Sequence, residues 1–355
     1  MADLAKIDAL STVIHGIPLP PAVQAHIDSL NILRAVRGTT GIEGTEVSEA
    51  EVQEIIRAPQ RQVLSDARHR AELEVRNAEH VMRFVPWAVK QEPHYPVTEH
   101  LICEIHRLTT EGIDYPNNQP GMYRSHSVTV GTYVPPREYH DVRRLMAEFV
   151  DWFNGGPPRG WHPAVRAVAA HFYLISIHPF GDGNGRTARG LESYLLYQGG
   201  INARGFYSLA NYYYQRRPEY VAMLDHVRFD TNGDITPFIQ FALDGLVTEQ
   251  EAVHREILAE VTIMAFRDFA RAQLTQDGKL GTKAGQRMFH FLLGLPGDAV
   301  SIRELRMGGH PLSQLYHGVG AKTLSRDLNY LSEKELIKID AGQIRANVQI
   351  MQEFM

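Results

Sequence analysis

The sequence predicts a mainly α-helical protein with two small β regions, and three observations support this fold class. Residues 22–36 place four apolar side chains at three-residue steps, which line one helix face: Ile27, Leu30, Leu33 and Val36. Runs of β-forming residues are confined to two short stretches, 121–136 and 336–350. The chain of 355 residues exceeds the usual size of one domain, so we expect two or three.

The composition is ordinary for a globular protein. The net charge of -5 argues against a protein that coats nucleic acid along its whole surface. Cys103 is the only cysteine, so no intramolecular disulfide can form, and a reducing compartment, the cytoplasm, is expected. No run of about 20 apolar residues occurs, so neither a membrane span nor a membrane partner is expected.

Further helices follow from the pattern along the chain. A glycine-bearing break is expected at residues 38–44, and long helices at 48–83, with Ser48 and Glu51 as a capping box at their start. Residues 163–177 are the most apolar helix candidate, and a further long helix starts at Thr236.

The two β regions differ in their surroundings. In residues 121–136, valines and a tyrosine around Gly131 predict a hairpin of short strands. In residues 284–355, helix candidates at 284–293, 301–307 and 321–335 precede strands at 336–340 and 344–350. Three helices followed by a two-stranded wing are typical of a winged helix.

The stretch from His178 to Arg189, HPFGDGNGRTAR, carries the chemistry. Three glycines within five residues let backbone N–H groups converge, and a helix N-terminus directly after them points its positive end at the same place. Arg186 and Arg189 can grip phosphate oxygens, and Asp182 suits Mg²⁺. His178 is a candidate general base. This combination predicts phosphoryl or nucleotidyl transfer.

Other interpretations of this loop fit less well. A functionless glycine turn has to explain several coincidences at once. The preceding strand of a dinucleotide-binding fingerprint and the Gly-Lys-Ser/Thr of a P-loop are both missing. An EF-hand needs an acid or amide where Arg186 stands, and a structural zinc site needs more His or Cys nearby. His171, on an apolar helix, is more typical of a satisfied core residue.

The run matches the motif H-x-F-x-[DE]-G-N-G-R-x-x-R at every defined position, so the chain resembles the Fic family. The resemblance implies a helical Fic core with a β-hairpin flap, followed by the winged helix. It implies that His178 deprotonates a target hydroxyl, which attacks the α-phosphate of ATP, while Asp182 holds Mg²⁺ or Mn²⁺. The expected ATP contacts are Glu43, Val130, Gly131, Gly183, Asn184, Gly185, Arg186, Arg189, Tyr220 and Asn232.

A second match lies upstream, where Thr39, Glu43 and Gly44 fit [ST]-x-x-x-E-[GN], which resembles the inhibitory motif of Fic proteins. A carboxylate inserted beside Arg189 would occupy the guanidinium that should hold the γ-phosphate. The alternative is an exposed glutamate after a turn. If Glu43 does reach Arg189, one chain carries both the enzyme and its inhibitor.

We therefore expect an N-terminal helical region at residues 1–95, a Fic core at 96–245, a linker helix at 246–283 and the winged helix at 284–355. The expected activity is a protein adenylyltransferase inhibited by Glu43, with ATP and a Tyr, Ser or Thr hydroxyl of a protein, the chain's own included, as its partners. Three alternatives stay open: transfer from a nucleotide other than ATP, an enzyme that removes AMP, and a DNA-binding regulator whose core senses a nucleotide. A homodimer also stays open. So does DNA contact through the helix expected at 321–335, the candidate recognition helix, on which Lys322 and Arg326 are expected to be exposed.

Overall fold

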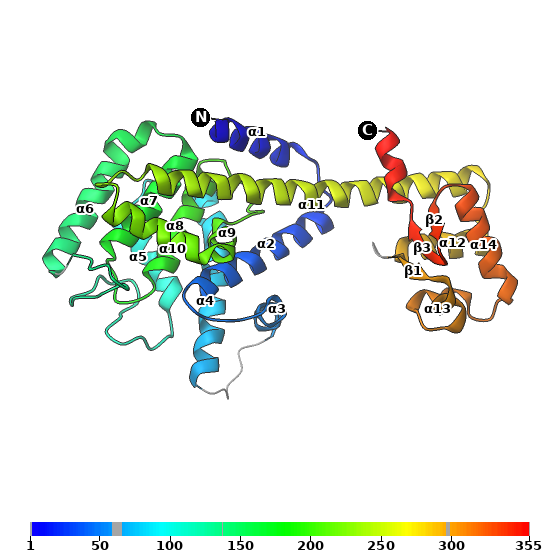
Figure 1. Ribbon diagram of the computed structural model, residues 1–355, viewed down its shortest axis with the longest axis horizontal. Coiled ribbons are helices and arrows are strands. Elements are labelled where there is room, and N and C mark those ends of the chain that lie inside the picture. Colours follow the sequence, from blue (N-terminus) through cyan, green and yellow to red (C-terminus); the bar gives the residue numbers. More distant parts are fainter. Residues whose placement is uncertain (1, 59–65, 137, 296–298, 355) are drawn as a thin grey trace. The chain divides into compact units, whose positions relative to one another are not determined.

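A computed structural model describes residues 2–58, 66–136, 138–295 and 299–354 (Figure 1). Contacts divide the chain into two compact units, residues 1–255 and 256–355. Helices predominate in both units, so the predicted mainly α fold class is confirmed. None of the helices in the described ranges is long and apolar enough to cross a membrane.

The first unit is built around two consecutive helices, α7 and α8, that pack against each other. Helices α2, α4 and α5 cover α8. The elements are α1 (Ala2–Gly16), α2 (Pro21–Ile42), α3 (Glu49–Arg57), α4 (Asp66–Gln91), α5 (Glu99–Thr110), α6 (Tyr139–Gly155), η1 (Pro157–Gly160), α7 (Pro163–Ile177), α8 (Asn184–Gln198), α9 (Leu209–Gln215) and α10 (Arg217–Phe229). Helix α11 (Thr236–Gln276) starts in the first unit and ends in the second.

Local signals in the sequence set several of these boundaries. The capping box at the start of α3 is present: the Ser48 hydroxyl accepts the Glu51 N–H, and the Glu51 carboxylate accepts the Ser48 N–H. Pro163 occupies the first turn of α7, where its missing N–H leaves no bond unmade. Residues 59–65, within the stretch expected to be helical, lie outside the described residues.

The break expected at residues 38–44 is wrong in its start, because α2 continues through Gly38 and Gly41 to Ile42. The two glycines are needed for packing and not for a turn. A Cβ on Gly38 would lie 2.6 Å from the Ala210 carbonyl oxygen, and one on Gly41 would lie 2.3 Å from the Tyr214 ring. Helix α9 therefore approaches the α2 backbone closely at the point where α2 enters the site.

The expected hairpin in residues 121–136 is much reduced. Val130 and Tyr133 form one isolated antiparallel bridge with two hydrogen bonds of 2.9 Å, and Gly131 takes a positive φ of 56° between them. The rest of the segment is irregular, and the Arg124 N–H donates to the Pro179 carbonyl of the catalytic loop.

The second unit contains the three-stranded sheet and its own core. Helices α12 (Lys283–Gly294), α13 (Ile302–Met307) and α14 (Ala321–Glu333), with η2 (Pro311–Tyr316), pack on β1 (Val300–Ser301), β2 (Ile337–Asp340) and β3 (Gln343–Ala346), and η3 (Val348–Phe354) follows. The sheet order is β1-β3-β2, with both pairs antiparallel. Leu324, Leu328 and Leu331 form a stripe on α14 that is buried.

Two details of the second unit differ from the sequence expectation. Strand β3 ends at Ala346, whereas a strand was expected to continue to Ile350, and the chain turns into η3. Strand β1 was missed because a two-residue strand carries no readable period; it is fixed by pairing Val300 with Ile344.

The Gly38 packing generates a stability prediction. Gly38→Ala should lower the free energy of unfolding by about 1–3 kcal/mol, because overpacking against a backbone carbonyl outweighs the gain of about 1 kcal/mol in helix propensity. Gly16→Ala is the control, since a Cβ there meets no atom within 4 Å. Tryptophan fluorescence during urea unfolding reports on the first unit, which holds all three tryptophans. Equal stability of the two variants would contradict this packing account.

Candidate active site

The predicted site lies in the connection between α7 and α8. His178 follows the last residue of α7 and caps it in a left-handed conformation with φ 52°, and Gly183 caps α8 with φ 73°. The Asn184 side chain closes the loop: its oxygen accepts the Phe180 N–H and its nitrogen donates to the Phe180 carbonyl, both at 2.9 Å. Because this side chain is occupied, only the backbone of Asn184 is left to face a ligand.

His106 on α5 supports the loop, and no motif in the sequence predicts this role. Its ring stacks on Phe180 with centroids 3.7 Å apart. Nδ1 accepts the Gly121 N–H at 2.9 Å, so the proton is on Nε2, which donates to the Asp182 carbonyl at 3.0 Å. Burial lowers the pKa of His106 to about 4, so the ring is neutral and keeps this arrangement at neutral pH.

Arg124 joins the loop to the reduced hairpin segment. Its Nε donates to the His178 carbonyl at 2.8 Å, and its backbone N–H donates to the Pro179 carbonyl at 2.9 Å. The other two guanidinium nitrogens donate to the carbonyls of His126 and Pro136. Arg124 is buried, and it fixes the backbone on which His178 stands.

The His178 ring is arranged as a proton acceptor. Nδ1 lies 3.2 Å from the Ile175 carbonyl oxygen, which can only accept, so Nδ1 carries the proton and Nε2 has a free lone pair. Burial, with smaller contributions from Arg228 and Arg124, lowers the pKa of His178 to about 4. The imidazole is therefore neutral near pH 7, the form that a general base requires.

Glu43, just after α2, reaches Arg189 on α8. The Glu43 carboxylate accepts a hydrogen bond from Arg189 Nη2 at 2.5 Å, although the two residues are 146 positions apart. Arg189 also donates to the hydroxyl and the carbonyl of Thr39, at 2.9 and 3.1 Å. A Cβ on Gly185 would lie 2.2 Å from the same Glu43 oxygen. The carboxylate therefore stands against the first turn of α8, where backbone N–H groups attract anions.

Electrostatics keeps this contact charged. Burial raises the pKa of Glu43, but Arg189 and Arg186 lower it by more, so the net shift is downward. Burial lowers the pKa of Arg189, and Glu43 more than reverses this. Both groups stay ionised at neutral pH, as a charge-assisted pair.

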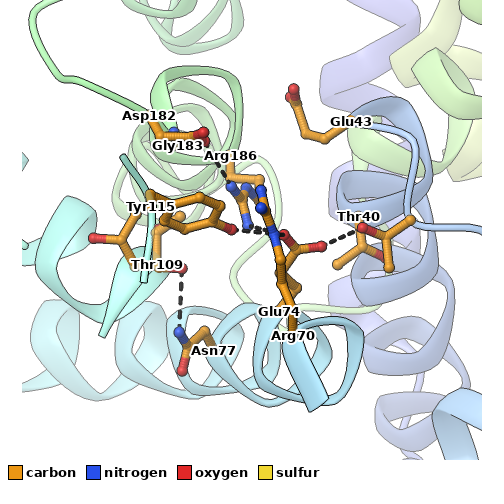
Figure 2. Close-up of polar contacts among 12 residues, drawn as sticks. Thr40, Glu43, Arg70, Glu74, Asn77, Thr109, Tyr115, Asp182, Gly183 and Arg186 are labelled. Atoms are coloured by element: carbon orange, nitrogen blue, oxygen red, sulfur yellow. Dashed lines mark hydrogen bonds and ion pairs between the residues drawn. The ribbon is translucent and has the colours of Figure 1, made fainter. Parts of the chain in front are cut away.

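Arg186, one turn earlier, is held by a different set of acids (Figure 2). Its Nη2 donates to Asp182 at 3.1 Å, its Nη1 lies 3.6 Å from a Glu74 oxygen, and its guanidinium lies over the Tyr115 ring. Sequence reasoning missed Glu74 and Tyr115, because they come from α4 and from the segment after α5. A charged residue on a long polar helix carries no signal that it turns inward.

Asp182 is the one candidate metal ligand in the loop. Its carboxylate accepts the Gly183 N–H at 2.5 Å and is 38% exposed. Among the described residues, no cluster of three or more His, Cys, Asp or Glu side chains could hold a metal. Such a lone, half-exposed carboxylate suits a divalent cation that takes its remaining ligands from phosphate oxygens and water.

The other predicted contacts lie in different settings. Tyr220 is buried, with its hydroxyl 3.0 Å from Nε2 of His171, whose Nδ1 meets Glu192, so His171 is a satisfied core residue as expected. Burial raises the pKa of Tyr220 to about 12 against the opposing effect of Arg189. Val130 and Gly131 form the exposed turn of the bridge, and Asn232 is exposed between α10 and α11. Their roles as ATP contacts stay predictions.

The geometry defines a helical domain with an anion cradle at a helix N-terminus, a neutral histidine beside it and two buried arginines above it. Residues 96–196 match the model of the Fic/DOC family. The chain is 28% identical over 241 residues to a protein adenylyltransferase Fic of Drosophila willistoni (68% of this chain, 45% of the relative). It is 31% identical over 206 residues to that of Aedes aegypti (58% and 38%). The chain therefore spans less than half the length of these relatives.

Solved structures show the same fold. Fic-1 (residues 134–508) of C. elegans superposes with a TM-score of 0.58 at 24% identity, covering 73% of this chain and 72% of that one. A Fic family protein from Desulfovibrio desulfuricans G20 superposes with a TM-score of 0.58 at 20% identity and covers 97% and 94%.

The two buried histidines predict a pH dependence. Because their folded-state pKa values lie near 4, below the ordinary 6.5, the unfolded chain binds protons that the folded chain does not. Their contribution is complete above pH 6.5 and is lost as the pH falls toward 4. The urea midpoint should therefore fall from pH 6.5 to 5, and His106→Gln should weaken this dependence. A midpoint that is constant over this range would show that these rings do not stay neutral.

Proposed function

We propose that this chain transfers AMP from ATP to a hydroxyl group of a protein, and that Glu43 holds it in an inhibited state. The observation that carries the proposal is the position of the Glu43 carboxylate, bonded to Arg189 and against Gly185 in the anion cradle. The relatives named protein adenylyltransferase Fic support AMP transfer as the reaction. The cradle, the neutral histidine and the buried arginines fit that chemistry.

In the proposed reaction, Nε2 of His178 accepts the proton of the attacking hydroxyl. The hydroxyl oxygen forms a bond to the α-phosphorus of ATP, the bond between that phosphorus and the bridging oxygen breaks, and pyrophosphate leaves. The backbone of Gly183, Asn184 and Gly185 would cradle phosphate oxygens at the start of α8. Removing a proton with a positioned base contributes typically about 10²–10⁴-fold to such a rate.

Asp182 would hold Mg²⁺ or Mn²⁺, which would neutralise charge on the phosphates when bound. The fit rests on the half-exposed carboxylate at the cradle, which is now bonded to Arg186 and the Gly183 N–H. The Gly183 N–H and Arg186 hold the Asp182 carboxylate at the cradle. A cation bound there would therefore compete with Arg186 for this carboxylate.

Glu43 would inhibit by substitution. The carboxylate takes the guanidinium and the helix terminus that the terminal phosphate of ATP requires, so ATP cannot bind productively while Glu43 is in place. This supports AMP addition with internal inhibition over removal of AMP. If the enzyme removed AMP, Glu43 would orient the attacking water. Here the Glu43 carboxylate instead accepts a hydrogen bond from Arg189, and the same guanidinium donates to Thr39.

Other expected properties stay predictions. They are DNA contact through α14, a homodimer, the four-region domain division and a reducing, cytoplasmic location based on the single cysteine. The target protein is proposed only by class, as one with an accessible hydroxyl side chain.

Removing the base tests the catalytic assignment. In a Glu43→Gly background, His178→Ala should reduce label transfer from α-labelled ATP by about 10²–10⁴-fold, with ATP affinity changed by less than a few-fold. His178→Asn is a useful companion, because asparagine tolerates the left-handed backbone better than alanine. Transfer at the parent rate in both variants would rule out His178 as the base.

Removing the inhibitory carboxylate tests the proposed function itself. Glu43→Gly should raise label transfer about ten- to a hundredfold, the value of a charge-assisted pair of about 1.5–3 kcal/mol. Glu46→Gln, an exposed neighbour on the same segment, is the control and should match the wild type. A Glu43→Gly enzyme that loses activity, or that releases AMP more slowly from a labelled protein, would favour the removal of AMP.

A further inference from the structure

A buried acid from α4, Glu74, lies beside Arg186 and has no place in the proposed reaction. Its side chain is only 7% exposed, and its hydrogen-bond donors come from its own helix and from two other parts of the chain. The Tyr115 hydroxyl donates to it at 2.6 Å, Arg70 donates at 3.2 Å, and the Thr45 hydroxyl is a third donor. Figure 2 shows Glu74 between Arg186 and the end of α2. A carboxylate this buried is stable only when such partners satisfy it.

Glu74 is also a charge partner of Arg186. The guanidinium of Arg186 is buried, and only its Nη2 has a hydrogen-bond partner among the described residues. That partner is Asp182, the proposed metal ligand, whose carboxylate would turn to a cation. Glu74, at 3.6 Å from Nη1, would then remain as the buried negative charge beside Arg186.

Thr45 connects Glu74 to the inhibitory segment. The Thr45 N–H donates to the Thr40 carbonyl at 3.1 Å, which forms a turn at the end of α2. The Thr45 hydroxyl donates a hydrogen bond to the Glu74 carboxylate. Glu43 lies inside this turn. Holding Thr45 in place therefore holds Glu43 in reach of Arg189.

We propose that Glu74 is a positioning residue that couples the inhibitory segment to the phosphate-binding arginines: it anchors the end of α2 through Thr45 and orients Arg186 on its other side. Glu74 then supports the inhibited state by anchoring the segment that carries Glu43, and it orients Arg186 whether or not Glu43 is in place. This assignment rests on the proposed function, since it concerns the regulation of the same site.

The anchor is tested in the full chain without relying on activity. Thr45→Val removes the hydroxyl with little change in shape. Amide hydrogen exchange in residues 40–45 should speed up by about tenfold, the value of a hydrogen bond to a charged acceptor. Thr40→Val is the matched control, because that hydroxyl donates only to Val36 and Arg37 carbonyls of its own helix. Exchange unchanged in Thr45→Val, or accelerated equally in both variants, would overturn the anchor.

The orienting role has its own readout. In the Glu43→Gly background, Glu74→Gln should raise the KM for ATP about three- to tenfold and change kcat by less than about twofold, because binding depends on Arg186 while the base does not. Glu72→Gln, on the same helix and equally buried beside Arg76, is the control and should leave KM unchanged. If both variants lost stability and neither changed the KM for ATP, Glu74 would have only a structural role, and the proposal would be overturned.

The two proposals fail differently. If Glu43→Gly shows no transfer with ATP, the proposed function is overturned, and the exchange comparison still decides whether Glu74 anchors the segment. If Glu43→Gly is active but Thr45→Val exchanges like the wild type, the coupling through Glu74 is wrong and the proposed function stands.

Discussion

The contact between the Glu43 carboxylate and Arg189 at the start of α8 is the interaction on which the site depends. Two properties attract an anion there: the free N–H groups of a helix terminus and a buried guanidinium. Because Gly185 has no side chain, an anion can approach the helix start closely. The Glu43 oxygen lies within 2.2 Å of where a Cβ on Gly185 would be. The helix terminus and the guanidinium can therefore bind a carboxylate as well as a phosphate, and in this chain Glu43 provides that carboxylate.

In the proposed reaction, the loop around His178 needs no rearrangement. His106 and Arg124 both hold the loop backbone, and the His178 ring is neutral with its proton on Nδ1. Nothing in the catalytic loop has to refold for proton transfer. What the inhibited arrangement withholds is Arg189, because Glu43 holds its guanidinium, while Arg186 stays oriented beside Glu74. In this account, regulation acts on nucleotide binding and leaves the chemistry preformed.

Much of this could be predicted from the sequence because the signals were local. The α7 boundaries, the capping box at Ser48 and the glycine loop each lie within one short stretch. The contact of Glu43 with Arg189 was predicted only through family resemblance, because no local rule joins residues 146 positions apart. Gly38 and Gly41 were misread as a break, since glycine permits both a turn and close helix packing. Glu74 and His106 were missed because their roles arise only when α4 and α5 fold against α8.

The most direct test compares the affinities of the wild type and Glu43→Gly for ATP and for AMP, measured by titration calorimetry with Mg²⁺ present. AMP lacks the γ-phosphate with which the carboxylate would compete. We expect Glu43→Gly to tighten ATP binding about ten- to a hundredfold and to leave AMP binding nearly unchanged. An equal gain for both nucleotides, or no gain for ATP, would contradict the claim that Glu43 occupies the place of a phosphate.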